Sequence, residues 1–163
     1  MVSYLNVGSA WGVATGNPKS FDTSNPCGTT IAVQTGTAQE TYAQELSKQC
    51  EADGKGKITI MPHELQTDIA TKIISGQYDA TLADSTVIGY TAAGSNGKIE
   101  QLGDVFESAP QGVAIAKDDA ELTEAVQQAM QYLMDNGYLE DILAHYGADS
   151  AAISTAEINP TVD

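Results

Sequence analysis

The sequence contains no arginine, and its few lysines against 22 aspartates and glutamates leave a formal net charge of −15 at pH 7. Nucleic-acid-binding domains need a basic stripe, and anionic membranes attract basic segments, so the composition argues against both partners. Without arginine the chain also lacks the guanidinium group that grips a carboxylate or phosphate with two parallel hydrogen bonds.

Metal, cofactor and membrane signals are also missing. The two histidines, His63 and His145, have no cysteine or histidine at metal-ligand spacing, which argues against a zinc site. The sequence has no nucleophile elbow, P-loop or complete dinucleotide fingerprint, so we predict no catalytic residue, no cofactor and no metal. No apolar run reaches transmembrane length, and no signal peptide precedes the first predicted strand, so we expect a fragment of a longer protein.

The chain has 163 residues, 42% of them hydrophobic, which is enough for one domain with a sizeable core. Short β-branched or apolar runs alternate with segments whose apolar residues recur at helical spacing. This alternation predicts an α/β fold with a mostly parallel sheet covered by helices on both faces. The predicted strands span residues 2–5, 8–16, 30–34, 58–61, 78–83, 99–102 and 112–116, with an irregular segment at 106–111. A long helix capped by Asp118 or Asp119 is predicted to bury Leu122, Val126, Met130 and Leu133.

The stretch Cys27–Glu40 is the most informative, because a predicted strand, Thr30–Gln34, runs into a tight turn and a helix. Gly36 can adopt the positive φ of such a turn. Thr37 and Glu40 fit the capping box, in which the Thr37 hydroxyl accepts the Glu40 N–H and the Glu40 carboxylate accepts the Thr37 N–H. The positive end of the helix dipole suits a small anion such as a carboxylate, and an ordinary strand-to-helix turn is the alternative.

A second polar position, Asp84, ends the apolar strand at 78–83. Its carboxylate could cap the following helix or accept a hydrogen bond from a ligand ammonium, and the residues leave both roles open. In parallel α/β sheets, ligands bind at the carboxyl ends of the strands. We therefore expect Gln34, Thr37 and Asp84 beside one cleft.

The two cysteines flank the same strand and helix, with Cys27 before the strand and Cys50 at the end of the helix. Because a strand packs against the helix that follows it, the two thiols could meet and form a disulfide. Such a bond would contribute about 3 kcal/mol and would indicate an oxidising compartment. The alternative is two unpaired buried thiols.

Five motifs, taken in order, resemble the bacterial extracellular solute-binding proteins of family 3, the amino acid substrate-binding proteins of ABC transporters. The resemblance runs from about Ser3 to about Gly147 and rests on the order and spacing of the motifs. They are Val-x-Tyr-Leu at 2–5, Cys-Gly-x-Thr-Ile-Ala-Val-Gln-x-Gly-Thr-x-Gln-Glu at 27–40, Ser-Gly-x-x-Asp-Ala-x-Leu-Ala-Asp-Ser at 75–85, Gly-Val-Ala-Ile-Ala-Lys-Asp-Asp-Ala-Glu-Leu at 112–122 and Asn-Gly-Tyr-Leu-Glu-Asp-Ile-Leu at 136–143.

The resemblance implies a type II periplasmic-binding fold, in which two α/β lobes close on an amino acid around two extended hinge strands. It assigns a first hinge strand to residues 1–7, a ligand-binding second lobe to 8–105, a return hinge to 106–112, the C-terminal portion of the first lobe to 113–147 and a loosely ordered tail to 148–163. The N-terminal part of the first lobe, which carries the family's carboxylate-clamping arginine, is then expected to be missing. The lack of arginine agrees with this expectation.

Carried over residue by residue, the resemblance implies five ligand-binding positions. Asp84 matches the aspartate that receives the ligand α-ammonium, and Gln34 matches a position beside the ligand side chain. The helix start that meets the α-carboxylate is matched by Thr37, Ala38 and Gln39. Many relatives have threonine at the position of Ala38, so one hydroxyl contact is lost. The Cys27–Cys50 pair resembles a disulfide found in a subset of relatives.

The implied function is reversible capture of a polar or other free amino acid by hinge closure, as the substrate-binding component of an ABC importer and not as an enzyme. The implied partners are the amino acid, the permease and the missing N-terminal lobe, and uncovered apolar stripes would favour self-association or a segment swap. The implied location is extracytoplasmic, either periplasmic or as a lipoprotein. The alternatives are an enzyme of the cyclohexadienyl dehydratase type, with Glu64 or Glu107 as the acid–base group, and the sensing domain of a receptor.

Overall fold

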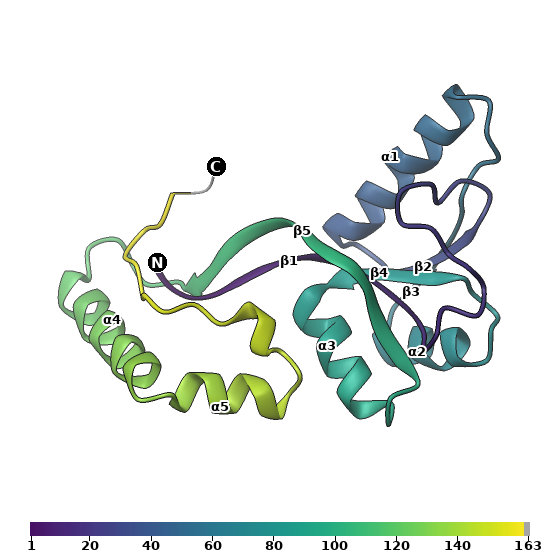
Figure 1. The fold of residues 1–163 in the computed structure, drawn as a ribbon. Helices are drawn as coiled ribbons and strands as arrows, with labels where there is room; N and C mark the ends of the chain where they lie inside the picture. Colours follow the sequence, from purple (N-terminus) through teal and green to yellow (C-terminus); the bar gives the residue numbers. More distant parts are fainter. Residues whose placement is uncertain (162–163) are drawn as a thin grey trace. The chain divides into compact units, whose positions relative to one another are not determined.

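The computed structural model describes residues 1–161 and is drawn in Figure 1; residues 162 and 163, the end of the predicted tail, lie outside the described residues. The chain forms two compact units. The larger unit spans Ser9–Phe106, and the smaller combines Met1–Gly8 with the residues from Glu107 onward. The larger unit therefore begins and ends one residue after the range that the resemblance assigns to the second lobe.

The larger unit is built around a sheet whose strand order is β3-β2-β4-β1-β5. β2 (Thr30–Gln34) lies between β3 (Thr59–His63) and β4 (Ala80–Asp84) and runs parallel to both. β4 pairs on its other side with β1 (Val2–Ala14), in the antiparallel direction. The predicted α/β class is confirmed, and the carboxyl ends of the three parallel strands share one edge of the sheet.

Helices cover both faces of this sheet, as the sequence predicts. Ile31 and Val33 of β2 pack in one cluster with residues of α1 (Ala38–Ala52). Ala32, between them, packs in another cluster with residues of α2 (Gln66–Ile74). Because successive side chains of a strand point to opposite faces, the apolar run of β2 is buried on both sides.

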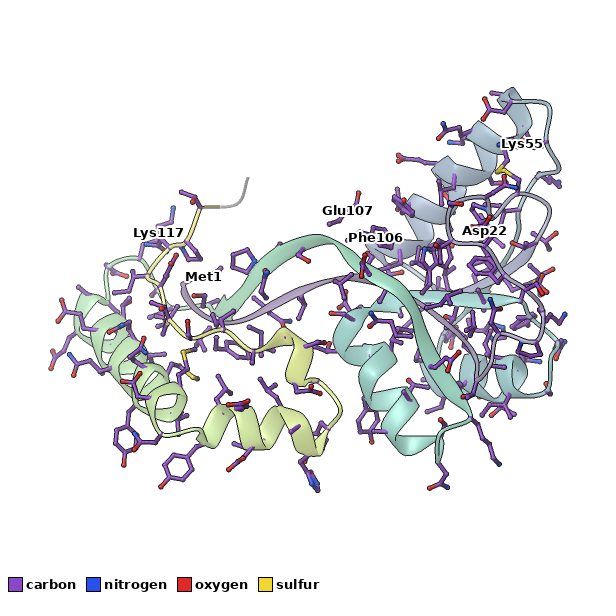
Figure 2. The ribbon with its side chains drawn as sticks, in the orientation of Figure 1. Met1, Asp22, Lys55, Phe106, Glu107 and Lys117 are labelled. Atoms are coloured by element: carbon purple, nitrogen blue, oxygen red, sulfur yellow. A yellow bond between two sulfur atoms is a disulfide. The ribbon has the colours of Figure 1, made fainter. Side chains whose placement is uncertain are left out.

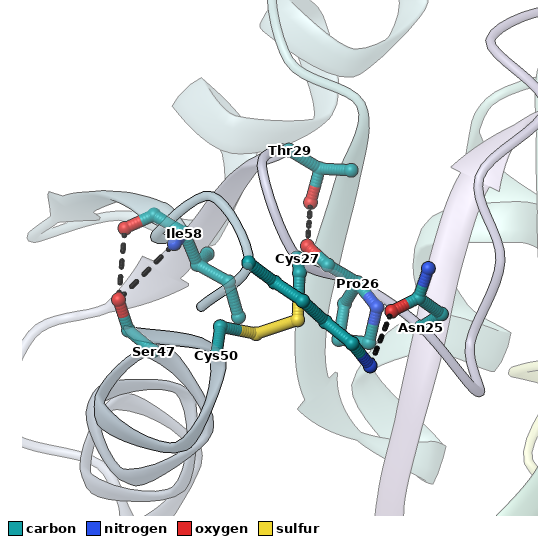
Figure 3. Close-up of a disulfide and its surroundings, with 8 residues drawn as sticks. Asn25, Pro26, Cys27, Thr29, Ser47, Cys50 and Ile58 are labelled. Atoms are coloured by element: carbon teal, nitrogen blue, oxygen red, sulfur yellow. Dashed lines mark hydrogen bonds between the residues drawn. A yellow bond between two sulfur atoms is a disulfide. The ribbon is translucent and has the colours of Figure 1, made fainter. Parts of the chain in front are cut away.

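The predicted disulfide joins Cys27 and Cys50, whose Cα atoms lie 5.5 Å apart. Figure 3 shows it between the loop that precedes β2 and the last turns of α1. Beside it, the Ser47 hydroxyl accepts the Ile58 N–H at 3.1 Å and donates to the Ile58 carbonyl at 3.2 Å. α1 is thus tied to the segment before β2 by the disulfide and to the segment before β3 by hydrogen bonds.

β5 (Ile99–Val113) is one continuous strand, so the irregular segment predicted at 106–111 is wrong. Pro110 is tolerated because β5 is the last strand of the sheet, where a missing N–H need not break the ladder. Figure 2 labels Phe106 and Glu107, at which β5 passes from the larger unit into the smaller. Glu107 has a φ of 51°, so the strand crosses this boundary through a left-handed residue.

The smaller unit contains α4 (Ala120–Asp135), α5 (Tyr138–His145) and a short 3-10 helix, Asp149–Ala151. Its main buried cluster consists of Leu5, Leu139, Leu143, Ala148 and Ala151. The prediction that α4 buries an apolar stripe is wrong, since no residue of α4 is buried and Leu122 is 47% exposed. The helical spacing is correct, and the described residues cover the stripe in part: Val126, Met130 and Leu133 are half-buried, and Leu133 packs against the buried cluster of the unit.

The C-terminal segment, predicted as a loosely ordered tail, differs from that expectation over residues 148–161. It is hydrogen-bonded on two sides. The Ser3 N–H of β1 donates to the Glu157 carbonyl at 2.9 Å, and the Glu157 N–H donates to the Ser3 hydroxyl at 3.0 Å. On the other side, the Gln131 side chain of α4 accepts the Ala156 N–H at 3.0 Å. A composition rich in alanine, serine and threonine does not reveal these partners, because they lie far away in the sequence.

Candidate functional site

Asp84 lies where β4 meets α3 (Ser85–Gly94), at the carboxyl edge of the parallel strands. Four buried residues precede it in β4, so the core fixes its position. Asp84 occupies the N-cap position of α3, but its side chain makes no capping hydrogen bond. Of the two roles that the sequence leaves open, the helix cap is therefore wrong.

The Asp84 carboxylate has a neutral partner: Gln39 Nε2 donates to Oδ1 at 2.9 Å. Within residues 1–161 it has no cationic partner, because the salt bridge found there joins Lys19 Nζ to Asp79 Oδ1 at 3.0 Å. Carboxylates that lose hydration on burial are normally compensated by a cation or by several donors. Asp84 is half-buried, so its carboxylate is suited to receive a cation from a ligand.

Gln39, the second residue of α1, is only 8% exposed. Its Nε2 also donates to Ser9 Oγ at 3.1 Å, so one amide nitrogen bridges β1 and β4. Ser9 is buried and lies directly opposite Asp84 in the pairing of β1 with β4. Ser9 is not among the predicted site residues; the local signal is a serine inside an apolar strand, but its partner depends on the strand register.

The start of α1 carries half of the predicted capping box. Thr37 is the N-cap, and its Oγ1 accepts the Glu40 N–H at 3.2 Å and donates to the Gln34 carbonyl at 2.7 Å. The other half is wrong, because Glu40 Oε2 accepts the N–H of Gly36, at 2.7 Å, instead of that of Thr37. Gly36 has a φ of 78°, and this left-handed turn presents its own N–H to the carboxylate.

Helix geometry leaves the N–H groups of Ala38 and Gln39 without an intrahelical acceptor. Ala38 is exposed, so an anion can reach its N–H, and the helix dipole favours that anion. The Glu40 carboxylate, at the same helix start, opposes it. Gln34 is half-buried at the end of β2, and its Nε2 donates to the Glu64 carbonyl at 3.1 Å.

Direct contacts thus join the predicted positions in two pairs, Gln34 with Thr37 and Gln39 with Asp84. Ala38 lies between the two pairs in the sequence. For the described residues, no group of three or more histidines, cysteines, aspartates or glutamates could hold a metal ion. No helix in this part of the chain is long and apolar enough to cross a membrane.

No protein-family model matches the sequence. The arginine-binding protein ArgT of Corynebacterium glutamicum is similar to it, with 39% identity over 159 residues, which make up 97% of this chain and 52% of ArgT. The chain therefore spans about half the length of this curated relative.

Solved structures share the fold at lower identity. An amino acid ABC transporter substrate-binding protein of Streptococcus pneumoniae, bound to L-arginine, matches with a TM-score of 0.67 and 22% identity over 93% of this chain and 61% of that protein. An ancestral amino acid-binding protein, described as a precursor of cyclohexadienyl dehydratase, matches with a TM-score of 0.65 and 24% identity over 89% of this chain and 60% of that protein. These matches confirm the predicted type II periplasmic-binding fold and the resemblance to amino acid substrate-binding proteins.

Proposed function

We propose that this chain, which shares the fold of amino acid substrate-binding proteins, captures a free amino acid without covalent chemistry and serves an ABC importer. One observation carries the proposal. The Asp84 carboxylate is half-buried at the carboxyl edge of the sheet, makes no cap to α3 and has no cation beside it within residues 1–161. A ligand α-ammonium supplies both the missing charge and hydrogen-bond donors.

The start of α1 supplies the contact to the ligand α-carboxylate. The Thr37 hydroxyl already donates to the Gln34 carbonyl, so its hydrogen is in use. The N–H groups of Ala38 and Gln39 are the donors that remain. Gln34 lies beside the ligand side chain, and closure occurs about β1 and β5, the two strands that pass between the units.

We infer that the ligand is a cationic amino acid such as L-arginine. ArgT is named for arginine, and the structure from Streptococcus pneumoniae holds L-arginine. The net charge of −15 attracts a cationic ligand over long range. The permease of the importer is the macromolecular partner, and the location is extracytoplasmic, where the Cys27–Cys50 disulfide forms and persists.

The enzyme alternative has no specific support at this site. Glu64 and Glu107, the two candidate acid–base groups, are both exposed, and burial is the usual way to tune a carboxylate for proton transfer. The similar ancestral protein that is described as a precursor of cyclohexadienyl dehydratase is itself named as an amino acid-binding protein. We therefore propose a binding protein and not an enzyme.

Asp84→Ala is expected to weaken amino acid binding by this chain at least tenfold, because the ligand ammonium loses its charged partner. Because the chain spans about half of its relative, the unmodified protein is expected to bind L-arginine weakly, with a dissociation constant near 1 mM, which is about −4 kcal/mol. Amide NMR shifts, followed during a titration with L-arginine, measure affinity in this range. Asp104→Ala, which changes an exposed aspartate of the same unit, is the matched control and should keep the affinity of the unmodified protein.

Two results would contradict the proposal of weak amino acid binding through Asp84. A tight, stoichiometric heat of binding from the chain alone would show that it holds the whole site, without a contribution from the part of the fold that it does not span. No shift with any of the common amino acids, at concentrations of many millimolar, would overturn the binding function and leave Asp84 as a structural residue.

The isolated chain is expected to self-associate through the apolar face of α4 and α5. Leu122, Tyr132, Tyr138 and Ile142 are 47%, 60%, 51% and 51% exposed. We propose that the part of the relatives' fold not spanned here covers this face, and that a second copy covers it in its absence. Light scattering should give a mass that rises with protein concentration. The mass should be lower in the double variant Leu122→Ser/Ile142→Ser, whereas Leu65→Ser, at an exposed position of the larger unit, should have the mass of the unmodified protein. A monomer mass at every concentration would argue against this interface.

A further inference from the structure

We propose that Gln39 is a positioning residue, whose side-chain amide fixes the Asp84 carboxylate in the orientation that receives a ligand ammonium. This inference rests on the proposed amino acid-binding function and assigns Gln39 a different task from the one that the resemblance implies. There Gln39 belongs to the segment that meets the ligand carboxylate. Here its side chain acts on the opposite end of the ligand, through Asp84.

The hydrogen-bond inventory of the amide carries this assignment. A glutamine Nε2 has two hydrogens. In this structure it has two acceptors, Asp84 Oδ1 at 2.9 Å and Ser9 Oγ at 3.1 Å. Both hydrogens are therefore in use, and none is left for a ligand. The carboxylate also fixes which end of the amide faces it, because the amide oxygen would meet a second acceptor there.

Burial makes this arrangement rigid. Gln39 is 8% exposed and Ser9 5% exposed, so neither side chain has free solvent in which to change rotamer. Ser9 and Asp84 face each other in the register of β1 and β4, and the amide of α1 closes the group. Residues of three elements thus form one hydrogen-bonded group in which the Gln39 amide, itself held by Ser9, contacts Oδ1 of Asp84, and the proposal assigns Oδ2 to the ligand.

A neutral donor at this place has a functional consequence. A lysine or arginine would neutralise Asp84 and compete with the ligand ammonium, whereas an amide orients the carboxylate and leaves its charge in place. The backbone N–H of the same residue lies at the helix start proposed for the ligand carboxylate. Gln39 therefore links the two ends of the ligand site, by its side chain at one end and its backbone at the other.

The test uses three probes on this chain: L-arginine, agmatine, which lacks the carboxylate, and 5-guanidinopentanoic acid, which lacks the α-ammonium. Affinities are measured by NMR titration for the unmodified protein, Gln39→Leu, Ser9→Ala and Asp84→Ala. Gln39→Leu should weaken L-arginine and agmatine about tenfold, the usual size of a lost hydrogen bond to a charged group, and leave 5-guanidinopentanoic acid unchanged. Ser9→Ala should give the same pattern with a smaller change.

Gln44→Leu, at an exposed position of the same helix, is the control for folding and for added apolar surface. If Gln39→Leu weakens the two carboxylate-bearing probes and spares agmatine, Gln39 contacts the ligand carboxylate directly and the inference is overturned. Equal weakening of all three probes, with Gln44→Leu unaffected, would reduce Gln39 to a general structural residue. If the unmodified protein ignores all three probes, the binding function fails and the inference fails with it.

Discussion

Loss of the Cys27–Cys50 disulfide is expected to lower the free energy of unfolding of the larger unit by about 3 kcal/mol. The two cysteines are 23 residues apart, and a cross-link over a loop of this length restricts the unfolded chain by that amount. A unit of this size should lose on the order of 15 °C in melting temperature. The loop contains all of β2 and most of α1, so the strand and helix that build the candidate site lose a shared constraint.

Trp11 reports on this unit, because it is the single tryptophan of the sequence and is 4% exposed in the core. Thermal melts followed by its fluorescence should show the loss both in Cys27→Ala/Cys50→Ala and in the unmodified protein under a thiol reductant. The reductant should have no effect on the double variant, which separates the disulfide from the packing of its sulfur atoms.

Ser47→Ala is the matched control on the same helix, because it removes the neighbouring hydrogen bonds to Ile58 and leaves the disulfide intact. It should cost about 1 kcal/mol and keep the full response to reductant. If reduction leaves the melting temperature of the unmodified protein unchanged, packing and these hydrogen bonds alone hold α1 in place.

The strand, turn and helix from Thr30 to Ala52 are predictable from the sequence, because their signals are local. An apolar β-branched run, a glycine and an N-cap threonine follow one another within a few residues. The structure confirms the strand, the helix and the hydrogen bond from the Glu40 N–H to Thr37. The predicted partner of the Glu40 carboxylate, the Thr37 N–H, is wrong. The carboxylate accepts the Gly36 N–H instead, because the backbone angles of Gly36, which the capping pattern does not specify, point that N–H toward it.

The group formed by Ser9, Gln39 and Asp84 shows where local signals end. Asp84 can be placed at the end of its strand from the pattern alone. Gln39, whose amide donates to Asp84, is 45 residues away in the sequence. Ser9 lies opposite Asp84 on the antiparallel strand β1. Strand register is set by which faces are buried and by the neighbouring elements, so no short window of sequence contains it.

The smaller unit shows a different limit. Periodicity correctly predicts that α4 has an apolar face, but it carries no information on whether the chain supplies residues to cover that face. Composition likewise predicts a loose C-terminal tail, whereas Gln131 and Ser3 hold it through hydrogen bonds. Both differences arise from long-range contacts, which decide burial and order after the local structure is set.

Gly112→Ala is expected to destabilise the smaller unit by about 2–3 kcal/mol. A Cβ atom at Gly112 would lie 2.5 Å from the Val2 carbonyl oxygen and 2.9 Å from its carbonyl carbon. These are backbone atoms of β1, which cannot rotate away as a side chain can, so β5 and β1 would have to separate locally. Only glycine, which has no Cβ atom, permits this approach.

Hydrogen exchange of the Ser3 amide measures this effect, because that amide donates to Glu157 beside the site of the clash. Its exchange should accelerate about 30- to 150-fold in Gly112→Ala, the rate change that corresponds to 2–3 kcal/mol. Gly94→Ala is the control: a Cβ there meets nothing within 4 Å, and alanine is the better helix former. If the fluorescence melt of Trp11 falls in parallel with the protection of Ser3, the two units unfold as one cooperative block. If the melt is unchanged, β1 and β5 join two units of independent stability.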